Sequence, residues 1–343
     1  MSSGDVPSVQ VSVIIPTYNR EKDLDECLNS LFTQTKRVKE ILIVDDSDSN
    51  LVSNLIESRI DEFEDINILL RYIRNNRERS LTIARNIGIN SAVGDIVLFL
   101  DSDVILDKDY VKYILKIYED FPHALGVQGV IQNTYDNRVV SRAISLYNKI
   151  FLIYLRPANE CKLLPSLGVS YPSIITEIIN CEWLSGANQS YRAKILEEFK
   201  FDENLKKYSQ GEDIDMSYRI FRKYPDTLFM TPSAKLIHKS SEQGRHLKKD
   251  VIYMDIIYLT YLFYRNIDQS LKNKIIYWWS RLGRILFSIV FSIFRSESKF
   301  SEIKYTIMSL FYCMRHIRDI KNRNLDFFNK NMVLSINEGF KWL

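Results

Sequence analysis

The sequence lacks the marks of several large classes of protein. Its four cysteines, at positions 27, 161, 181 and 313, form no Cys-x-x-Cys pair and no cluster with histidine. Neither a disulfide scaffold nor a structural zinc site is therefore expected, and a reducing compartment is the default. The N-terminus has no basic stretch followed by an apolar run, so no secretory signal is predicted. No solenoid, heptad or collagen period is present, which excludes repeat and fibrous architectures.

The composition indicates a folded protein longer than one ordinary domain. The chain has 343 residues, of which 46% are hydrophobic, and that fraction is ample for a packed core. At this length we expect one large domain with an appendage, or two domains.

Charge is unevenly distributed along the chain. Residues 1–238 hold 28 basic and 34 acidic side chains, whereas residues 239–325 hold 16 and 7. The acidic body argues against binding of nucleic acid. The basic, aromatic tail is expected to meet something anionic, such as phospholipid headgroups or a phosphate-bearing substrate.

Strand and helix patterns alternate over the first 105 residues. Buried-strand patterns cover 11–16, 40–46, 67–74 and 95–103, and helical patterns cover 21–35, 50–63 and 81–93. Further on, strands are predicted at 126–132 and before His238, a loop at 156–175, and a helix from 211. This order predicts an α/β fold with a mostly parallel sheet flanked by helices, in which ligands bind beyond the carboxyl ends of the strands.

Acidic residues follow two of these strands. Asp101 and Asp103 form a D-x-D at the end of an apolar run, and alternation in a strand would point both carboxylates to one side. Two such oxygens suit magnesium or manganese, although turns are also rich in aspartate. Asp45 and Asp46 end another strand, where they either cap the loop or accept from the N–H of a nucleobase.

Two further groups each allow a functional and a structural interpretation. Glu212 and Asp213 begin a helix, where one of them could act as a general base or both could simply complement the helix dipole. Arg85 precedes the D-x-D strand and could bind a phosphate or pair with a surface acid.

The tail from about residue 247 is predicted to be helical. Between Trp278 and Phe294 apolar residues recur at helical spacing, with Arg281 and Arg284 on the other face. The longest uncharged run there is residues 285–294, too short for the roughly twenty residues of a membrane span. An amphipathic helix at a membrane surface, or packing of its apolar face on the body, is expected instead.

Five segments, in this order and at these spacings, closely resemble the family 2 inverting glycosyltransferases with the GT-A fold. They are VSVIIPTYNR (11–20), ILIVDDSDS (41–49), ARNIGINSAVGDIVLFLDSD (84–103), WLSGANQSYR (183–192) and GEDIDMSYR (211–219). The resemblance covers residues 9–240. It implies a GT-A domain there, followed by a helical tail over 247–325 and a C-terminal segment over 326–343.

The resemblance implies a role for each matching residue. The residues implied for the nucleotide-sugar are Pro16, Thr17, Tyr18, Arg20, Asp46 (which fits slightly better than Asp45), Arg85 and Asp101. Asp103, with Asp101 and a downstream His238, would hold Mn²⁺ or Mg²⁺, unless His238 is structural. Asp213, beside Glu212, would be the catalytic base. Gly186, Ala187 and Asn188 would approach donor sugar and acceptor, and Trp183 would either stack on a sugar or lie in the core.

The implied activity is metal-dependent transfer of a single sugar from a nucleotide-sugar, with inversion. Processive synthases of this family carry Gln-x-x-Arg-Trp and membrane spans, whereas here the nearest match is EQGRH (242–246). The tail loosely resembles those of surface-polysaccharide and rhamnosyl-type transferases. A glycan or lipid-linked acceptor and a cytoplasmic location, free or peripheral on the inner face of the membrane, are therefore expected.

Two alternatives stay open at this point. A sugar nucleotidyltransferase usually has a glycine-rich N-terminal loop, which PTYNR (16–20) lacks. A non-catalytic carbohydrate-binding protein would not need the intact D-x-D and Glu-Asp pairs.

Overall fold

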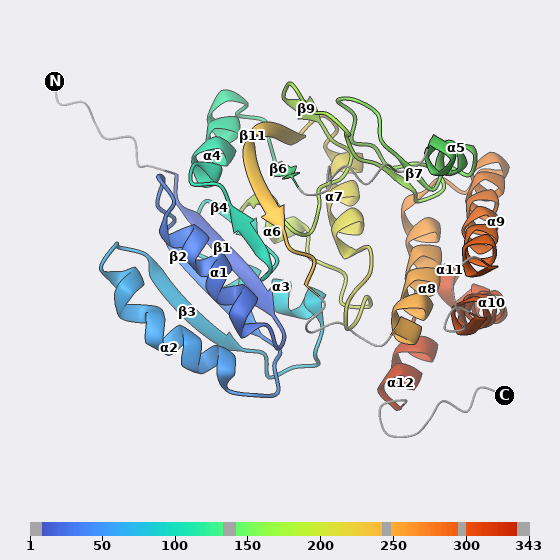
Figure 1. Ribbon diagram of the computed structural model, residues 1–343, viewed down its shortest axis with the longest axis horizontal. Helices are drawn as coiled ribbons and strands as arrows, with labels where there is room; N and C mark the ends of the chain where they lie inside the picture. Colours follow the sequence, from blue (N-terminus) through green and yellow to red (C-terminus); the bar gives the residue numbers. More distant parts are fainter. Residues whose placement is uncertain (1–8, 133–141, 242–247, 294–299, 335–343) are drawn as a thin grey trace.

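The structure, a computed structural model, describes residues 9–132, 142–241, 248–293 and 300–334. Figure 1 shows a sheet with helices on both faces, and a group of helices at one end that comes from the C-terminal part of the chain. The strands are β1 (Val11–Thr17), β2 (Glu40–Asp45), β3 (Leu69–Arg74), β4 (Ile96–Phe99), β5 (Val104–Leu106), β6 (Gly126–Ile131), β7 (Tyr154–Leu155), β8 (Val169–Ser170), β9 (Ile179–Asn180), β10 (Gln189–Arg192) and β11 (Leu228–His238).

The helices of the body lie between these strands, and helices are found close to the predicted ranges 21–35, 50–63 and 81–93 and from residue 211. They are α1 (Glu21–Phe32), α2 (Leu51–Glu64), α3 (Leu81–Ser91), α4 (Tyr110–Asp120), α5 (Arg142–Ile150), α6 (Ile195–Glu198) and α7 (Glu212–Lys223).

The main sheet is parallel in its first half and mixed in its second. Its strand order is β3-β2-β1-β4-β10-β6-β11-β5, with β9 alongside β11. The four strands β1 to β4 pair in parallel, as predicted. By contrast, β10 runs antiparallel to both β4 and β6, and β5 runs antiparallel to β11. The prediction of a mostly parallel sheet therefore holds only for its first half.

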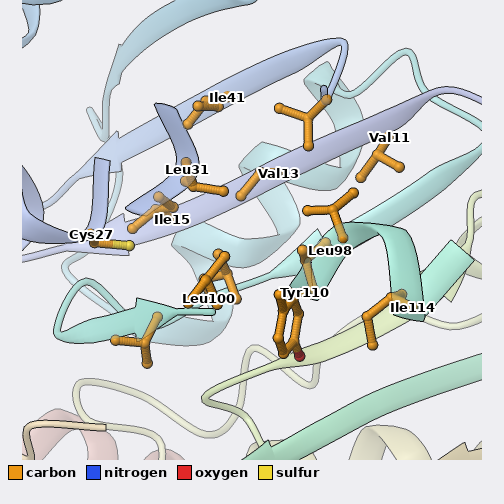
Figure 2. Packing of buried hydrophobic residues seen from close by; sticks show 14 of the residues in the cluster. Val11, Val13, Ile15, Cys27, Leu31, Ile41, Leu98, Leu100, Tyr110 and Ile114 are labelled. Carbon is orange, nitrogen blue, oxygen red and sulfur yellow. The ribbon is translucent and has the colours of Figure 1, made fainter. Parts of the chain in front are cut away.

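Alternation along β1 divides the core into two layers. Val11, Val13 and Ile15 face α1, α2 and α4, and Figure 2 shows β1 residues packed beside Leu31 of α1 and Tyr110 of α4. Ile14 faces α3, α6 and α7 on the opposite side of the sheet. Gly88 lets α3 approach closely, because a Cβ there would lie 2.4 Å from Ile14 Cγ2. The β-branched strand residues thus fix the sheet whose ends carry the site.

The C-terminal helices pack around a third apolar cluster of their own. They are α8 (Lys248–Asn266), α9 (Leu271–Ile293), α10 (Phe300–Arg315), α11 (Ile317–Lys321) and α12 (Asp326–Leu334). Phe328 of α12 belongs to the same cluster as Tyr258 of α8, so the packed unit continues past residue 325. Within the described ranges, no helix combines the length and hydropathy that a membrane span needs.

Helix α9 turns the side that carries Arg281 toward the protein. Arg281 is 3% exposed, whereas Trp279, Leu282 and Leu286 are 39–43% exposed. Helix α5 covers Gly283, where the Tyr147 hydroxyl donates to the Gly283 carbonyl oxygen at 2.6 Å. The expectation that the apolar side of this helix packs on the body is therefore wrong for these residues.

Candidate active site

The carboxyl ends of β1, β2 and β4 border a cavity of about 320 Å³, as expected for ligand sites of parallel sheets. Its walls include Asp46 after β2, Asp101 and Asp103 after β4, Asp213 of α7 and His238 at the end of β11. Pro16, Thr17, Tyr18 and Arg20 line it from the end of β1, and Gly186, Ala187 and Glu212 line it from the opposite side. Acids far apart in the sequence thus share one cavity.

Asp101, Asp103 and His238 form a cluster that suits a divalent metal ion. One ligand atom from each lies within 4.8 Å of the others. Asp103 is 1% exposed, and its Oδ2 accepts from the Ser241 N–H at 2.9 Å and lies 3.4 Å from Arg20 Nη1. Its Oδ1 lies 3.2 Å from His238 Nε2 and accepts no hydrogen bond of good geometry within the described residues. A buried carboxylate oxygen in this state, beside an imidazole, is a fitting metal ligand.

The charges of this cluster favour an ionised Asp103. Burial raises the pKa of Asp103, but the close imidazole of His238, with Arg20 and the Ser241 N–H, lowers it to about 2. Burial lowers the pKa of His238, but Asp103 and Asp101 raise it more. The carboxylate is therefore available as an anionic ligand throughout the physiological pH range.

Strand pairing, rather than sequence proximity, delivers His238 to the aspartates. Strand β4 ends at Phe99, so Asp101 and Asp103 lie in the turn between β4 and β5, not within a strand as predicted. His238 pairs with Val104 of β5, and the Lys239 N–H donates to the Asp103 carbonyl oxygen at 3.0 Å. The pairing of the antiparallel strands β5 and β11, and not alternation along one strand, thus brings His238 to the two aspartates.

Glu212 and Asp213 occupy the first turn of α7, after Gly211, whose φ of +84° is a left-handed conformation that glycine tolerates. The Gly186 N–H donates to Asp213 Oδ2 at 2.8 Å, and the Ile214 N–H donates to Oδ1 at 2.8 Å. A Cβ on Gly186 would lie 3.3 Å from Asp213 Cβ, so a small residue is needed there. These contacts fix the Asp213 carboxylate at the cavity wall.

The two neighbouring acids are held in a poorly solvated place. Burial raises the pKa of Asp213, although the Gly186 N–H and Arg85 oppose this. Burial and the charge of Asp213 raise the pKa of Glu212 to about 8. Because the two groups interact, they titrate as a pair, and the last proton leaves well above the usual range for carboxyl groups.

Arg85 lies behind the cavity wall rather than on it. It is 1% exposed, and its guanidinium donates to Glu212 Oε1 at 2.7 Å, to the Gly186 carbonyl oxygen at 3.0 Å and to Asp101 Oδ1 at 3.4 Å. Arg85 is therefore neither a phosphate ligand nor part of a surface ion pair, the two interpretations that the sequence allowed. It is a buried cation that links the acid pair to the metal cluster.

Asp45 and Asp46 point to different places. Asp45 is fully buried, and accepts from the Tyr72 hydroxyl at 2.9 Å and from Arg74 at 3.1 Å, so it does not reach the cavity. Asp46 lines the cavity and accepts from Asn75 Nδ2 at 2.5 Å and from the Ser80 N–H at 3.1 Å. Burial raises the pKa of Asp46 to about 6. The predicted preference for Asp46 over Asp45 agrees with this placement.

Two of the residues predicted to meet the sugars lie in the core. Trp183 is 7% exposed, and its indole N–H donates to the Ser170 carbonyl oxygen at 3.1 Å, so its ring packs in the protein interior. Asn188 is fully buried and donates to the Gly129 carbonyl oxygen at 3.0 Å. The turn before β10 exposes only Ser185, Gly186 and Ala187 to the cavity.

Sequence reasoning missed two cationic side chains of the cavity. Arg79 lies over the Tyr18 ring at 4.2 Å and donates to the Tyr18 hydroxyl at 2.7 Å, and Lys207 lines the same cavity. The run RNNRERS (74–80) between β3 and α3 was the available signal for Arg79. With Arg20, these residues bring three cationic side chains to the cavity, which suits a diphosphate.

The tail of the chain also supports the first turn of α7. Asp215 is fully buried, and its Oδ1 accepts from Asn266 Nδ2 at 2.9 Å and lies 3.2 Å from Arg265 Nε. Both partners belong to the LFYRN segment (262–266) at the end of α8. The packing of α8 therefore reaches the helix turn that carries Asp213.

Solved structures share this fold, which is of the GT-A type. The Staphylococcus aureus TarS 1–349 structure in complex with UDP-GlcNAc aligns with a TM-score of 0.53 at 20% identity, covering 88% of this chain and 79% of that one. The mannosyltransferase PcManGT from Pyrobaculum calidifontis, in complex with GDP-Man and Mn²⁺, aligns with a TM-score of 0.53 at 14% identity over 92% and 88% of the two chains.

Sequence relatives are also glycosyltransferases. The glycosyltransferase GlyA of Streptococcus pneumoniae is 24% identical over 65% of this chain and 30% of its own length. An uncharacterized glycosyltransferase of Haemophilus influenzae is 23% identical over 96% of both chains. A Methanococcus voltae enzyme, dolichyl N-acetyl-alpha-D-glucosaminyl phosphate 3-beta-D-2,3-diacetamido-2,3-dideoxy-beta-D-glucuronosyltransferase, is 30% identical over 40% of this chain and 44% of its own.

A family model matches part of the chain. Residues 12–174 match the model of glycosyl transferase family 2, in agreement with the glycosyltransferase relatives. The chain spans less than a third of GlyA.

Proposed function

We propose that the protein is a divalent-metal-dependent, inverting glycosyltransferase that moves one sugar from a nucleotide-sugar to an acceptor hydroxyl. The observation that carries this proposal is the convergence of Asp46, the cluster of Asp101, Asp103 and His238, and Asp213 on one cavity. We assign the reaction to residues 9–240 and contacts with the acceptor or a membrane to the helices that follow.

The donor would lie across the carboxyl ends of β1, β2 and β4. Asp46 would accept from the N–H of the base, while Arg20, Arg79 and Lys207 would face the diphosphate. Mn²⁺ or Mg²⁺, held by Asp103 with Asp101 and His238, would neutralise the charge that develops on the leaving diphosphate. Gly186 and Ala187 would let the backbone approach the sugar.

Asp213 is the proposed base. Its carboxylate takes the proton from the acceptor hydroxyl, and the oxygen then forms a bond to the anomeric carbon of the donor. The bond from that carbon to the diphosphate breaks, and the electron pair leaves with the nucleoside diphosphate. Because the two bonds lie on opposite sides of the carbon, a single displacement inverts its configuration. Glu212 keeps its bond to Arg85, and the charge of Asp213 favours its protonated form.

Asp46→Asn tests whether Asp46 binds the nucleobase of the donor. Loss of a charged acceptor is expected to weaken donor binding by about tenfold, with kcat little changed, because the base lies away from the reacting carbon. The measurement is the KM and kcat of donor turnover. Asp65→Asn, an exposed acid at the end of α2, is the matched control. An unchanged KM would remove Asp46 from donor binding.

The acid pair predicts a pH dependence. The base must be deprotonated, and the pKa of Asp213 and of Glu212 are raised, so kcat is expected to fall as the pH is lowered toward 5. Because the charge of Asp213 raises the pKa of Glu212, Glu212 is still protonated while Asp213 ionises, and Glu212→Gln should therefore leave the acidic limb in place. Profiles of kcat between pH 4.5 and 9, recorded with constant metal saturation, measure both effects. A profile that is flat in both proteins would contradict this assignment.

We propose a phosphate-bearing lipid-linked or surface glycan as the acceptor class. The M. voltae relative is named for a dolichyl phosphate sugar acceptor, and the tail of this chain is basic. A membrane contact would fit such an acceptor.

A stripe of apolar side chains on α9 is proposed to lie on a membrane surface. Residues at helical spacing along α9 are 39–75% exposed: Leu271, Ile275, Trp279, Leu282 and Leu286. On the neighbouring α10, Phe311 and Met314 are exposed in the same way. Figure 1 shows these two helices at the end of the molecule away from β3. Such stripes on a basic unit favour an interfacial position on anionic lipid.

Vesicle binding tests this surface. Vesicles of phosphatidylcholine with 30% anionic lipid are expected to retain the protein, and retention should weaken as salt rises. Leu282→Ser with Leu286→Ser should reduce the bound fraction several-fold, because apolar burial drives insertion. Leu69→Ser, which removes an exposed leucine from β3, is the control. Equal sedimentation with and without vesicles would contradict an interfacial role.

A further inference from the structure

A second cavity, of about 520 Å³, lies between α5, α8, α9 and α10. Most of its wall is apolar, with Ile144 from α5, Ile252 from α8, Ile285 from α9 and Leu310 from α10. Figure 1 shows these four helices grouped together at the C-terminal end of the molecule. The cavity is large enough for a ligand and lies outside the acid-lined site described above.

Two arginines project into this apolar space. Arg281 is only 3% exposed, and its Nη2 donates to the Ser166 carbonyl oxygen at 3.4 Å. Its Nε and Nη1 have no hydrogen-bond partner in the part of the chain that the structure describes. Arg284 lines the same cavity one turn further along α9, where burial and the nearby Arg281 lower its pKa to about 10.

The lining of the cavity holds more positive than negative side chains. Asp255 of α8 is its acidic residue, and the charge of Asp255 acts on Arg284, whereas two guanidinium nitrogens of Arg281 keep no hydrogen-bond partner among the described residues. A buried guanidinium with unused donors costs stability unless an anion accepts from it. Planar guanidinium groups favour phosphate, which can accept two parallel hydrogen bonds. The apolar remainder of the wall suits a hydrocarbon chain attached to that phosphate.

This cavity adjoins the proposed transfer site. Gln210 lines both cavities, and it lies three residues before Asp213, the proposed base. Gly211 packs against α8, since a Cβ there would lie 2.9 Å from Leu262 Cδ1. A phosphate bound at Arg281 would therefore be separated from the Asp213 cavity by one loop.

We propose that the second cavity binds the phosphate group and the adjoining apolar chain of a lipid phosphate, and holds this acceptor beside the transfer site. Its role as an acceptor site rests on the proposed glycosyltransferase function, whereas the binding itself does not. The exposed stripe of α9 would place the cavity at the membrane surface, where such a lipid is found.

Isothermal titration of the full chain with decyl phosphate, below its micelle concentration, tests the binding. One saturable site per chain is expected. Inorganic phosphate, which lacks the chain, and decanol, which lacks the charge, should each bind at least about tenfold more weakly. Inorganic phosphate binding as tightly as decyl phosphate would overturn the proposal, because it would indicate a site for free phosphate. Non-saturable uptake of decyl phosphate would overturn it as well.

Two variants locate the site. Arg281→Gln should weaken decyl phosphate binding by at least about tenfold, without lowering the melting temperature, because it removes an uncompensated buried charge. Thr306→Phe fills part of the cavity from α10 and should weaken binding similarly. Arg318→Gln on α11, an exposed arginine, is the matched control. Wild-type affinity in both cavity variants would show that the ligand binds elsewhere and would overturn the proposal.

Donor turnover, measured in the same variants, separates this proposal from the previous one. Arg281 and Thr306 do not line the donor cavity, so hydrolysis of the donor by water should be unchanged in both. Absence of decyl phosphate binding with intact donor turnover would refute the acceptor site alone. Binding as predicted, with no turnover of any nucleotide-sugar, would support the lipid phosphate site and refute the glycosyltransferase function.

Discussion

Replacing Asp213 with asparagine is expected to lower sugar transfer by at least about a hundredfold, because an amide cannot take the proton of the acceptor hydroxyl. Donor affinity should stay within about twofold of wild type. The amide oxygen can still accept from the Gly186 N–H, as Asp213 Oδ2 does at 2.8 Å, and the variant loses only the bond from the adjacent Ile214 N–H. The rate of donor turnover and a calorimetric titration with the donor measure the two quantities.

The control for this variant is Asp226→Asn, which changes an exposed acid after α7 in the same chemical way. It should leave both the rate and the affinity unchanged. Transfer at the wild-type rate in the Asp213 variant would remove Asp213 from the mechanism. Loss of both donor affinity and transfer rate in the Asp213 variant would instead show that Asp213 is needed for donor binding.

Asp103→Asn is expected to weaken binding of Mn²⁺ by at least about tenfold and to reduce turnover in proportion at limiting metal. Asp103 is the buried member of the cluster, and its Oδ1 accepts no hydrogen bond of good geometry within the described residues. Loss of its charge therefore leaves only a half-exposed aspartate and an imidazole for the ion. The paramagnetic resonance signal of free Mn²⁺, titrated with protein, measures the affinity directly.

Two outcomes would separate a metal site from an ion-pair network. Asp61→Asn, which alters an exposed acid of α2, should bind Mn²⁺ as wild type does. If the Asp103 variant also binds Mn²⁺ as wild type does, the ion lies elsewhere. His238→Gln is expected to weaken Mn²⁺ binding less than Asp103→Asn does, because the imidazole carries no negative charge.

The placement of Asp46 and the D-x-D could be predicted from the sequence because it follows from a general property of parallel sheets. Strands β1, β2 and β4 have continuous apolar runs, and their carboxyl ends lie on one edge. Any polar residue directly after such a strand faces the same region. That Asp213 lies near these acids could be predicted only from the family resemblance, since no local pattern links α7 to that edge.

Other site residues were placed wrongly or missed because the sequence gives no local signal for tertiary contacts. Trp183 and Asn188 lie in a segment that resembles the family, yet their neighbours Ser170 and Gly129 come from remote parts of the chain. Asp45 is directed away from the cavity by Tyr72 and Arg74 of β3. Arg79 was missed because it lies in a loop, where neither period nor spacing marks a side chain as part of a site.

Helix α9 shows why amphipathicity alone does not fix which side is buried. Both of its faces carry apolar residues, and arginine side chains are rarely buried in proteins. In the structure Arg281 lies inside, while Trp279 and Leu282 are exposed. The inverted arrangement is the observation from which the lipid phosphate cavity follows.

Proton NMR of donor turnover, with water as acceptor, tests the central claim most directly because it needs no knowledge of the acceptor. A panel of UDP-, GDP- and dTDP-sugars is incubated with the protein and Mg²⁺, the diamagnetic ion of the pair, and the anomeric signals are followed before mutarotation. One donor should release a sugar whose first-formed anomer is inverted, and a metal chelator or Asp213→Asn should abolish the release. Retained configuration, or turnover that persists with chelator and in the Asp213 variant, would contradict a metal-assisted single displacement at this cavity.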